Sequence, residues 1–505
     1  MKEPARILIV GGGCTGVYTA LRLQRKLKRE IRRRTVRITV VDPDPLMTYR
    51  PFLPEAAAGS LSPVQVVVPL RQALPACEVI TGDITALDHD QRRATVLTEA
   101  AAEAGTGGTE LAYDELVLVP SPVPRPRPAS GTRGAGIGLR TAQEAAALRD
   151  HVLEQLDLAC STRDPALREA ALTFVFAGGG HAGVQVLAEL EDMTRHALRS
   201  FPTLTPDDTR WVLAEATDRL LPEADEELGR HALRELRERD IEVRFNTRVT
   251  SYEHRLAVLD DGTRIPTRTA VWTTGFAPHP ILAASGFPVN ARGRLRCTAD
   301  LRVHGVPHAW SAGETAAVPD LTADQWVRAA PETEEVRRDL PDAAPVPHHL
   351  TGEGGRRAVD APEHGRAHEP GRHPAGAPIP QPLCAATGQD AARQAKALAD
   401  NLVASLRGTP THEYRSKHTG TVVTLGLHKG VGQAYGRRLR GYPAWLAHRV
   451  YHLSRVPTPH RKARVLAEWT LTGLFKREVV PLGSPARPGA APGLVAGGGR
   501  DREAG

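Results

Sequence analysis

Near the start of the chain, hydrophobic positions first form a continuous run and then recur at helical spacing. Residues 7–11, ILIVG, are a continuous apolar run of the kind found in a buried parallel strand, and a helical pattern follows from about residue 15 to 28. The basic stretch KLKREIRRR is typical of a solvated helix face, and RITVVD at 37–42 predicts a second strand that ends in an acid. The pattern therefore predicts a βαβ unit.

The same order of elements returns in the middle of the chain. FVFAGGGHAGVQVLAELED at 174–192 predicts a strand, a glycine turn and a helix, and WVLAEA predicts a strand that ends near Glu215. Between the two units, residues 84–119 predict a β meander with the loop AAEAGTGGT, and the proline-rich stretch 120–131 predicts a crossing between domains. We therefore expect an internal pseudo-repeat.

Each unit carries a glycine motif that cradles a dinucleotide. The spacing G-x-G-x-x-G allows a tight turn, close approach of a pyrophosphate to the backbone, and close packing of helix on strand. A helix N-terminus then offers free N–H groups to the phosphates, and the acid at the end of the next strand accepts the ribose hydroxyls. These positions are Gly11, Gly13, Gly16 and Asp42 in the first unit and Gly178, Gly180, Gly183 and Glu215 in the second.

Two dinucleotide-binding cradles in one chain suit two cofactors, one that stays bound and one that binds, delivers a hydride and leaves. We expect FAD in the N-terminal cradle and NADH in the internal cradle, whose domain is inserted into the first. Glu215 would repel the 2′-phosphate of NADPH and therefore favours NADH. Arg219, four residues further on, could bind that phosphate, so NADPH is the alternative. Gly275, at the end of the second meander, is expected to let the nicotinamide lie close to the backbone.

Composition and charge narrow the class of protein. A length of 505 residues predicts two to four domains, and we find no apolar run long enough to span a membrane, no signal-peptide pattern and no C-x-x-C pair. Residues 437–477 hold ten Lys or Arg and one acid, a net charge of +9, whereas the whole chain carries +7. One local basic patch beside apolar residues favours an anionic membrane surface over nucleic acid. We expect no metal, because His364 and His368 have no nearby Cys and no stable helix to hold them as ligands.

Several stretches resemble the type II, non-proton-pumping NADH:quinone oxidoreductases. They are VDPDPLMTYRPFLPEAAAGSLSP at 41–63, VLAEATDRLLPEADEELGRHALRELRERDIEVRFNTRVT at 212–250, TAVWTTGFAPHPIL, HAWSAGE, and TLGLHKGVGQAYGRRLRGYPAWLAHRVYHLSRVP at 424–457. The resemblance implies an α/β fold of two Rossmann-like domains, hydride transfer from NADH to FAD, and electron transfer from the flavin to a membrane quinone.

The resemblance also implies site residues. Pro54 lies in the flavin-contacting segment, Gly313 and Glu314 would meet the FAD ribityl or pyrophosphate, and Gln389 with Arg393 would form the quinone site. Gln185 follows the second glycine turn, where the family usually has a carboxylate, and it cannot carry a proton as a carboxylate does. Ser121 and Glu314 are further departures, since the family has Gly and Asp at these positions.

The expected domain organisation follows the chain. It is an FAD-binding domain in three parts (1–140, 286–321 and 383–435, the last with the quinone site), an NADH-binding domain (165–285), a disordered insertion (322–382), membrane-associating helices (436–480) and a disordered tail (484–505).

The C-terminal helices suggest where the protein works. Trp445, Leu446, Val450 and Leu453 recur at helical spacing with Arg449 and Arg455 between them, which favours a helix lying in the membrane interface. We expect a peripheral protein on the cytoplasmic face of the cell membrane, and a homodimer is among the expected assemblies. The alternatives are a flavoprotein that senses NADH or binds a partner, a soluble NAD(P)H reductase of a small redox protein, and a sulfide:quinone oxidoreductase. A disulfide reductase is disfavoured because Cys14 has no close partner in sequence.

Overall fold

The computed structural model describes residues 3–124, 136–273, 276–322, 383–384, 388–416, 420–434 and 436–475. Its first sheet has five parallel strands in the order β21-β9-β1-β2-β5. They are β1 (Ala5–Val10), β2 (Val36–Asp42), β5 (Glu78–Thr81), β9 (Glu115–Leu118) and β21 (Ala309–Trp310). The strand β9 is buried at all four positions, as expected for a sheet covered on both faces.

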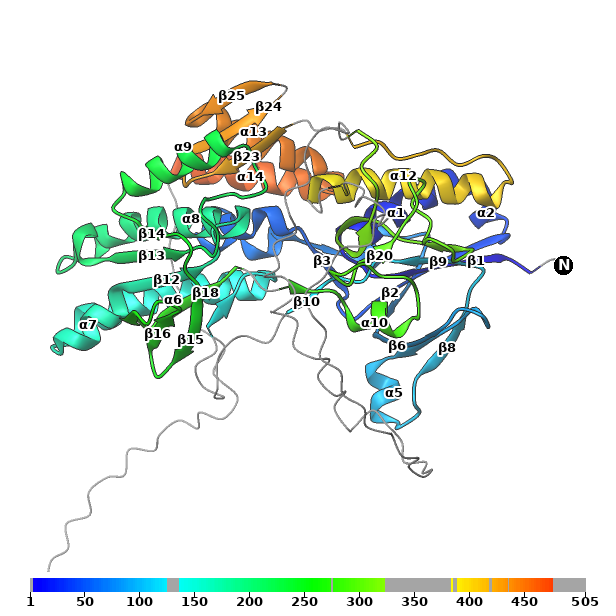
Figure 1. Cartoon of the computed structure of the whole chain (residues 1–505), viewed down its shortest axis with the longest axis horizontal. Coiled ribbons are helices and arrows are strands. Elements are labelled where there is room, and N and C mark those ends of the chain that lie inside the picture. The colour runs from blue at the N-terminus through cyan, green and yellow to red at the C-terminus, as the bar shows by residue number, and fades with distance from the viewer. Residues whose placement is uncertain are drawn as a thin grey trace, which may run out of the picture.

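Helices and a small meander cover this sheet. Helix α1 (Cys14–Lys26) lies alongside α12 (Gly388–Leu406), although about 360 residues separate them in the chain (Figure 1). The meander is β6 (Asp83–Asp88), β7 (Arg93–Leu97) and β8 (Thr109–Ala112). Residues 99–100, which we expected at the end of a strand, and 101–103, which we expected in a loop, form helix α5 (Glu99–Glu103), because Thr98 caps it by accepting a hydrogen bond from the backbone N–H of Ala101.

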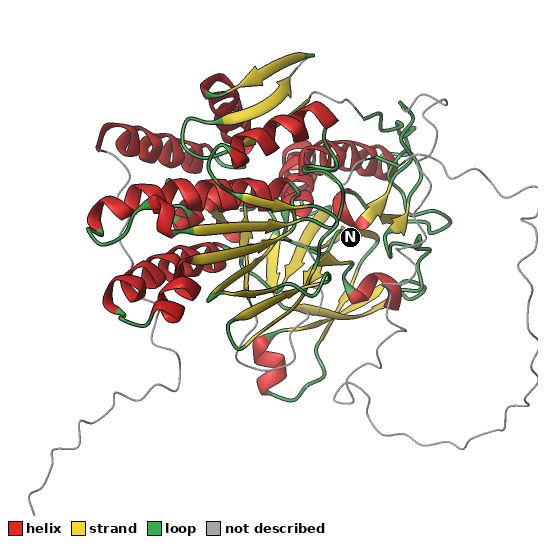
Figure 2. Cartoon of the chain, turned by 60° about the vertical axis from the view of Figure 1, so that its left-hand side comes forward, coloured by secondary structure: helices red, strands yellow, loops and turns green. Residues whose placement is uncertain are grey.

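The second sheet repeats the first. Its five parallel strands run in the order β11-β18-β12-β13-β14. They are β11 (Ile137–Gly138), β12 (Thr173–Ala177), β13 (Arg210–Ala214), β14 (Glu242–Arg244) and β18 (Thr269–Trp272). Helices α8 (His181–Ala197) and α9 (Glu226–Arg237) belong to this unit, with the meander β15 (Val249–Glu253), β16 (Leu256–Leu259) and β17 (Arg264–Pro266). Figure 2 shows these helices and strands as separate layers.

The order of strands shows how the two units are joined. Strand β21 follows the whole second sheet in sequence, yet it pairs with β9 of the first sheet. The second unit is therefore inserted into the first, and the expected fold class of two Rossmann-like domains is confirmed.

The C-terminal part adds a further unit on the second domain. Strands β23 (Gly420–Thr424), β24 (Gly430–Ala434) and β25 (Arg437–Arg440) form an antiparallel sheet that contacts α8 and α9. Helix α13 (Tyr442–Arg455) packs on this sheet, and α14 (Pro459–Phe475) follows it (Figure 1). The boundary that we placed at residue 435 falls inside this sheet. No helix in the described ranges is long and apolar enough to cross a membrane.

Further elements, most of them short, complete the described structure. They are α2 (Lys28–Arg32), β3 (Leu46–Thr48), η1 (Arg50–Phe52), α3 (Leu53–Ala57), β4 (Val67–Pro69), α4 (Leu70–Ala73), α6 (Ala142–Ser161), α7 (Pro165–Leu172), α10 (Pro280–Ala284) and η5 (Gly313–Thr315). Residues 323–382, which make up nearly all of the predicted insertion, lie outside the described residues, as do Gly275 and the predicted tail 484–505.

Candidate functional site

The first glycine turn is closed by direct contacts between backbone atoms. Gly11 has a φ of +115°, and a Cβ there would lie 2.1 Å from the carbonyl oxygen of Val119. A Cβ on Gly16 would lie 1.8 Å from the carbonyl oxygen of Gly11. Gly13 is the N-cap of α1, so the free N–H groups of that helix begin at the turn.

Asp42 joins this turn from the end of β2. Its Oδ2 accepts a hydrogen bond from Gly12 N at 2.5 Å and its Oδ1 accepts one from Asp44 N at 2.8 Å. Burial raises the pKa of the carboxyl to about 6, against the lowering effect of these hydrogen bonds. The carboxylate is therefore positioned beside the turn and is costly to ionise.

We predict that Asp42→Asn weakens flavin binding about 10- to 100-fold, the range expected when a charge-assisted hydrogen bond is lost. An amide has one acceptor oxygen, so it cannot serve Gly12, Asp44 and a ribose as a carboxylate does. Titration of flavin-free protein with FAD, followed by flavin fluorescence, measures the change. Unaltered affinity would contradict the role given to Asp42.

The raised pKa of Asp42 also predicts the direction of a pH effect. A folded-state pKa of about 6 against an ordinary 3.8 makes a stabilising contribution of about 3 kcal/mol. That contribution is complete below about pH 4 and is lost as the pH rises through 6. Flavin-free Asp42→Asn protein should therefore lose less thermal stability than the parent between pH 4 and pH 7.

The second turn has the same construction. Gly178 has a φ of +108°, and a Cβ on Gly183 would lie 1.9 Å from the carbonyl oxygen of Gly178. Gly180 is the N-cap of α8, and a Cβ there would meet nothing within 4 Å. Open space thus lies at the N-terminus of α8, where a pyrophosphate would bind.

Glu215 occupies the position that Asp42 has in the first unit. Its Oε2 accepts a hydrogen bond from Gly179 N at 2.5 Å, and its Oε1 accepts two from Thr217 at 2.8 Å. Arg219, the cation that could bind the 2′-phosphate of NADPH, donates a guanidinium N–H to the carbonyl oxygen of Pro222. The carboxylate is therefore held at the turn while the nearby cation is engaged elsewhere.

Gly313 and Glu314 lie beside the first turn. Gly313 has a φ of +74°, and its N–H donates to Gln394 Oε1 at 2.7 Å. A Cβ on Gly313 would lie 2.4 Å from Thr15 Oγ1 on α1, so the segment touches the N-terminal turn of that helix. Glu314 forms an ion pair with Arg50 at 3.3 Å. Sequence reasoning missed Gln394 and Arg50, neither of which stands in a glycine motif.

The remaining predicted residues are distributed over three helices. Pro54 is buried in α3, in the same turn as Glu55. Gln389 is partly buried in the first turn of α12. Arg393 lies one turn further along the same helix, with its Nη1 3.6 Å from Asp390 Oδ1. Gln185 instead contacts β23 and α13: its Nε2 lies 3.3 Å from Thr424 Oγ1 and 3.1 Å from His448 Nε2. The histidine was missed, although His448 and His452 stand four residues apart in the sequence.

Helix α13 is held by a buried ion pair. Arg449 Nη2 lies 2.9 Å from Glu55 Oε2, and both side chains are less than a tenth exposed. The guanidinium lies over the rings of Trp445, at 4.0 Å, and Trp469, at 4.6 Å, whose Nε1 donates to Glu55 at 3.0 Å. The helical pattern predicts a membrane-facing surface that includes Trp445 and Arg449; this prediction is wrong for both residues, because Arg449 pairs with Glu55 and both side chains are buried.

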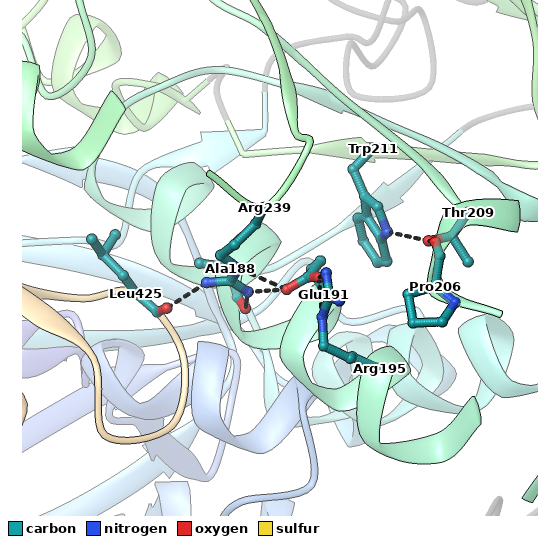
Figure 3. Close-up of polar contacts among 8 residues, drawn as sticks. All are labelled: Ala188, Glu191, Arg195, Pro206, Thr209, Trp211, Arg239 and Leu425. Atoms are coloured by element: carbon teal, nitrogen blue, oxygen red, sulfur yellow. Dashed lines mark hydrogen bonds and ion pairs between the residues drawn. The ribbon is translucent and has the colours of Figure 1, made fainter. Parts of the chain in front are cut away.

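The sheet that carries α13 is fixed to α8 by Arg239. Its guanidinium donates to the carbonyls of Leu425 at 2.6 Å and Ala188 at 2.7 Å and pairs with Glu191 (Figure 3). Glu191 also accepts hydrogen bonds from Arg195 (Figure 3). One arginine thus ties the C-terminal sheet to the helix that begins at the second glycine turn.

Comparisons with known proteins agree with this arrangement. A family profile described as pyridine nucleotide-disulphide oxidoreductase matches residues 5–333. The chain is 27% identical over 329 residues to a type II NADH:quinone oxidoreductase of Mycobacterium tuberculosis, covering 63% of this chain and 67% of that protein. It is 23% identical over 495 residues to an internal alternative NAD(P)H-ubiquinone oxidoreductase of Arabidopsis thaliana, covering 94% and 86%.

A solved structure shares the fold across almost the whole chain. NDH2 from Plasmodium falciparum, in complex with NADH, superposes with a TM-score of 0.74 at 14% identity and covers 95% of this chain and 100% of that one. The profile match extends over more than half of the chain and includes both glycine turns. The chain therefore belongs to the pyridine nucleotide-disulphide oxidoreductase family.

Proposed function

We propose that the protein is an FAD-dependent NADH:quinone oxidoreductase. The observation that carries this proposal is the pair of dinucleotide cradles, one inserted in the other, each with its own carboxylate at the glycine turn. The named activities of the relatives from M. tuberculosis and A. thaliana support the same function. FAD, when bound, accepts the hydride of NADH and passes two electrons to the quinone.

The residues of the first unit fit a flavin dinucleotide. Gly13 begins α1 with its free N–H groups at the turn, and Asp42 offers a carboxylate beside them. Gly313 closes against Thr15, which brings η5 next to the same helix end. The second unit supplies the matching elements for NADH, with open space at Gly180 and a fixed carboxylate at Glu215.

An anaerobic titration tests this function. Purified protein should be yellow, should bleach when NADH is added, and should recover its colour when a soluble quinone follows. Colourless protein that does not take up added FAD would contradict flavin binding. Bleaching without recovery would instead favour a flavoprotein that senses NADH, an alternative supported by Glu314 engaging Arg50 and by Ser121 Oγ lying 3.0 Å from the Cβ position of Gly13.

We propose that the visiting nucleotide is NADH. Glu215→Gln removes the negative charge that opposes a 2′-phosphate and keeps one acceptor for Gly179 N. We predict that the ratio of kcat/KM for NADH to that for NADPH falls about tenfold, which corresponds to about 1.4 kcal/mol. Steady-state kinetics with both nucleotides measure it, with the exposed Asp260→Asn in the same domain as control. An unchanged ratio would show that Glu215 does not discriminate.

We also propose that the protein docks on the cytoplasmic face of the cell membrane as a peripheral protein. The exposed apolar side chains of the last two helices support this: Leu446 and Val450 on α13, and Leu466, Leu471, Leu474 and Phe475 on α14. Such a surface next to basic residues suits an interfacial helix. The homodimer stays a prediction, and light scattering of the purified protein tests it by measuring the molar mass in solution.

A vesicle assay tests the docking surface. We predict that the protein co-sediments with vesicles containing anionic lipid, and that Leu474→Glu with Phe475→Glu reduces the bound fraction at least about tenfold, since each buried apolar side chain contributes about 1.5–3 kcal/mol. Leu321→Glu, an exposed leucine elsewhere on the surface, is the control. Equal binding by the wild type, the double variant and the Leu321→Glu control would contradict the proposed docking surface.

A further inference from the structure

The C-terminal end of helix α13 touches α1, the helix that begins at the FAD cradle. Tyr18, in the second turn of α1, donates its hydroxyl hydrogen to the carbonyl oxygen of Arg455, the last residue of α13. From another side, Tyr49 Oη donates to the carbonyl oxygen of His452 at 3.2 Å. Tyr49 directly precedes η1, so the last turn of α13 is held between α1 and the segment that enters η1.

Two charged residues of the flavin domain lie near the same end of α1 and neutralise each other. Arg50 Nη1 in η1 lies 3.3 Å from Glu314 Oε2 in η5. Glu314 follows Gly313, where a Cβ would lie 2.4 Å from Thr15 Oγ1 in the first turn of α1. The ion pair therefore stands beside the N-terminus of α1 and adds no net charge there.

Arg455 is a third charged residue at this end of α1, and no carboxylate of the described residues forms an ion pair with it. Its side chain is partly buried, and its guanidinium lies 5.3 Å from the ring centroid of Tyr451. Its charge also acts on the first residue of α1: burial raises the pKa of the Cys14 thiol to about 12, and the charges of Arg50 and Arg455 oppose this rise. A partly buried guanidinium that has lost hydration is stabilised by an anion.

We propose that Arg455 is the counter-ion of the FAD pyrophosphate. This inference rests on the proposed function, in which the pyrophosphate lies at the N-terminus of α1. The pyrophosphate is a dianion, whereas the helix end supplies only about half a positive charge. Of the three charged residues at this end, Arg50 and Glu314 are paired with each other, so Arg455 is the cation that remains for the phosphates. A residue of the C-terminal unit thus completes the FAD cradle.

Two substitutions separate the charge of Arg455 from its packing. Arg455→Met keeps an unbranched side chain that can lie on Tyr451 but removes the charge, whereas Arg455→Lys keeps the charge. We expect Arg455→Met to weaken binding of FAD to the flavin-free protein about 10- to 100-fold, the range for a lost charge-assisted hydrogen bond, and Arg455→Lys to stay within about fivefold of the wild type. Arg464→Met removes an exposed arginine from α14 and is the matched control, which should bind FAD like the wild type.

Salt gives a second readout that a purely packing role would not change. The attraction between a guanidinium and a phosphate is screened as the ionic strength rises. The FAD dissociation constant of the wild type should therefore increase between about 0.05 M and about 0.5 M KCl, and that of Arg455→Met should increase clearly less. Fluorescence titration of flavin-free protein with FAD measures these constants, and thermal unfolding shows whether each flavin-free variant is folded.

The outcomes distinguish the two levels of inference. Folded Arg455→Met protein that binds FAD as tightly as the Arg464→Met control, or more weakly but with the salt dependence of the wild type, would overturn the role of Arg455. Yellow wild-type protein that NADH bleaches and quinone reoxidises would still support the proposed function in that case. Should Arg455→Met not fold, a wild-type affinity for FAD that salt leaves unchanged would overturn the role. Wild-type protein that binds no FAD at any ionic strength would overturn the proposed function and this proposal together.

Discussion

Gly183→Ala protein should remain yellow and lose its response to NADH, whereas Gly16→Ala protein should be purified without flavin. In each case the new Cβ would lie within 2 Å of a backbone carbonyl oxygen, that of Gly178 or that of Gly11. Neither oxygen can move without opening the glycine turn, because each belongs to the first residue after the strand that precedes the helix. We expect flavin content near that of the wild type in Gly183→Ala, with bleaching by NADH reduced by about 100-fold or more, since a misplaced binding group can cost that much.

The control for this pair is a glycine in open space. A Cβ on Gly473 of α14 would meet nothing within 4 Å, so Gly473→Ala should leave both flavin content and bleaching unchanged and should slightly favour the helix. Absorbance of the purified variants and anaerobic NADH titration provide both measurements. Colourless Gly183→Ala protein would mean that the inserted domain and the flavin domain fail together, against the separate roles assigned to the two cradles.

The cradles could be predicted from sequence because their information is local. A strand, three glycines and a helix fit within about 20 residues, and the acid follows at the end of the next strand. The parallel pairing of β1 with β2 and of β12 with β13 then brings Asp42 and Glu215 to the turns. The inserted topology did not follow from the repeat alone, because two successive domains would show the same repeat; the insertion was expected from the pattern of flavoproteins that bind two dinucleotides, and the pairing of β21 with β9 shows it.

The contacts of α13 could not be predicted in this way. Glu55 and Arg449 are 394 residues apart, and Gln185 and His448 are 263 apart, so no local pattern connects them. The sequence around Arg449 alternates basic and apolar residues, which equally fits a helix on a membrane. Only the position of α3 under α13 shows that Arg449 has an acidic partner. The four-residue spacing of His448 and His452 was visible in the sequence, but the contact of Tyr49 Oη with His452 Nδ1, at 3.1 Å, was not.

We predict that Arg449→Met lowers the free energy of unfolding by about 3 kcal/mol, because Glu55 is left as an uncompensated buried charge. Adding Glu55→Gln should restore at least half of the loss: the amide oxygen still accepts from Trp469, and no charge remains. For a domain of about 150–250 residues, the single variant should melt about 6–12 °C lower. Thermal unfolding of both singles and the double gives the coupling energy as a double-mutant cycle.

An exposed ion pair on the surface is the control for this double-mutant cycle. Arg93 and Glu110 are 2.7 Å apart, but their side chains are 57% and 63% exposed, so Arg93→Met should cost less than about 0.5 kcal/mol. If Arg449→Met melts like Arg93→Met, the ion pair does not hold α13 on the flavin domain, and the contact between Tyr49 and His452 must depend on other packing.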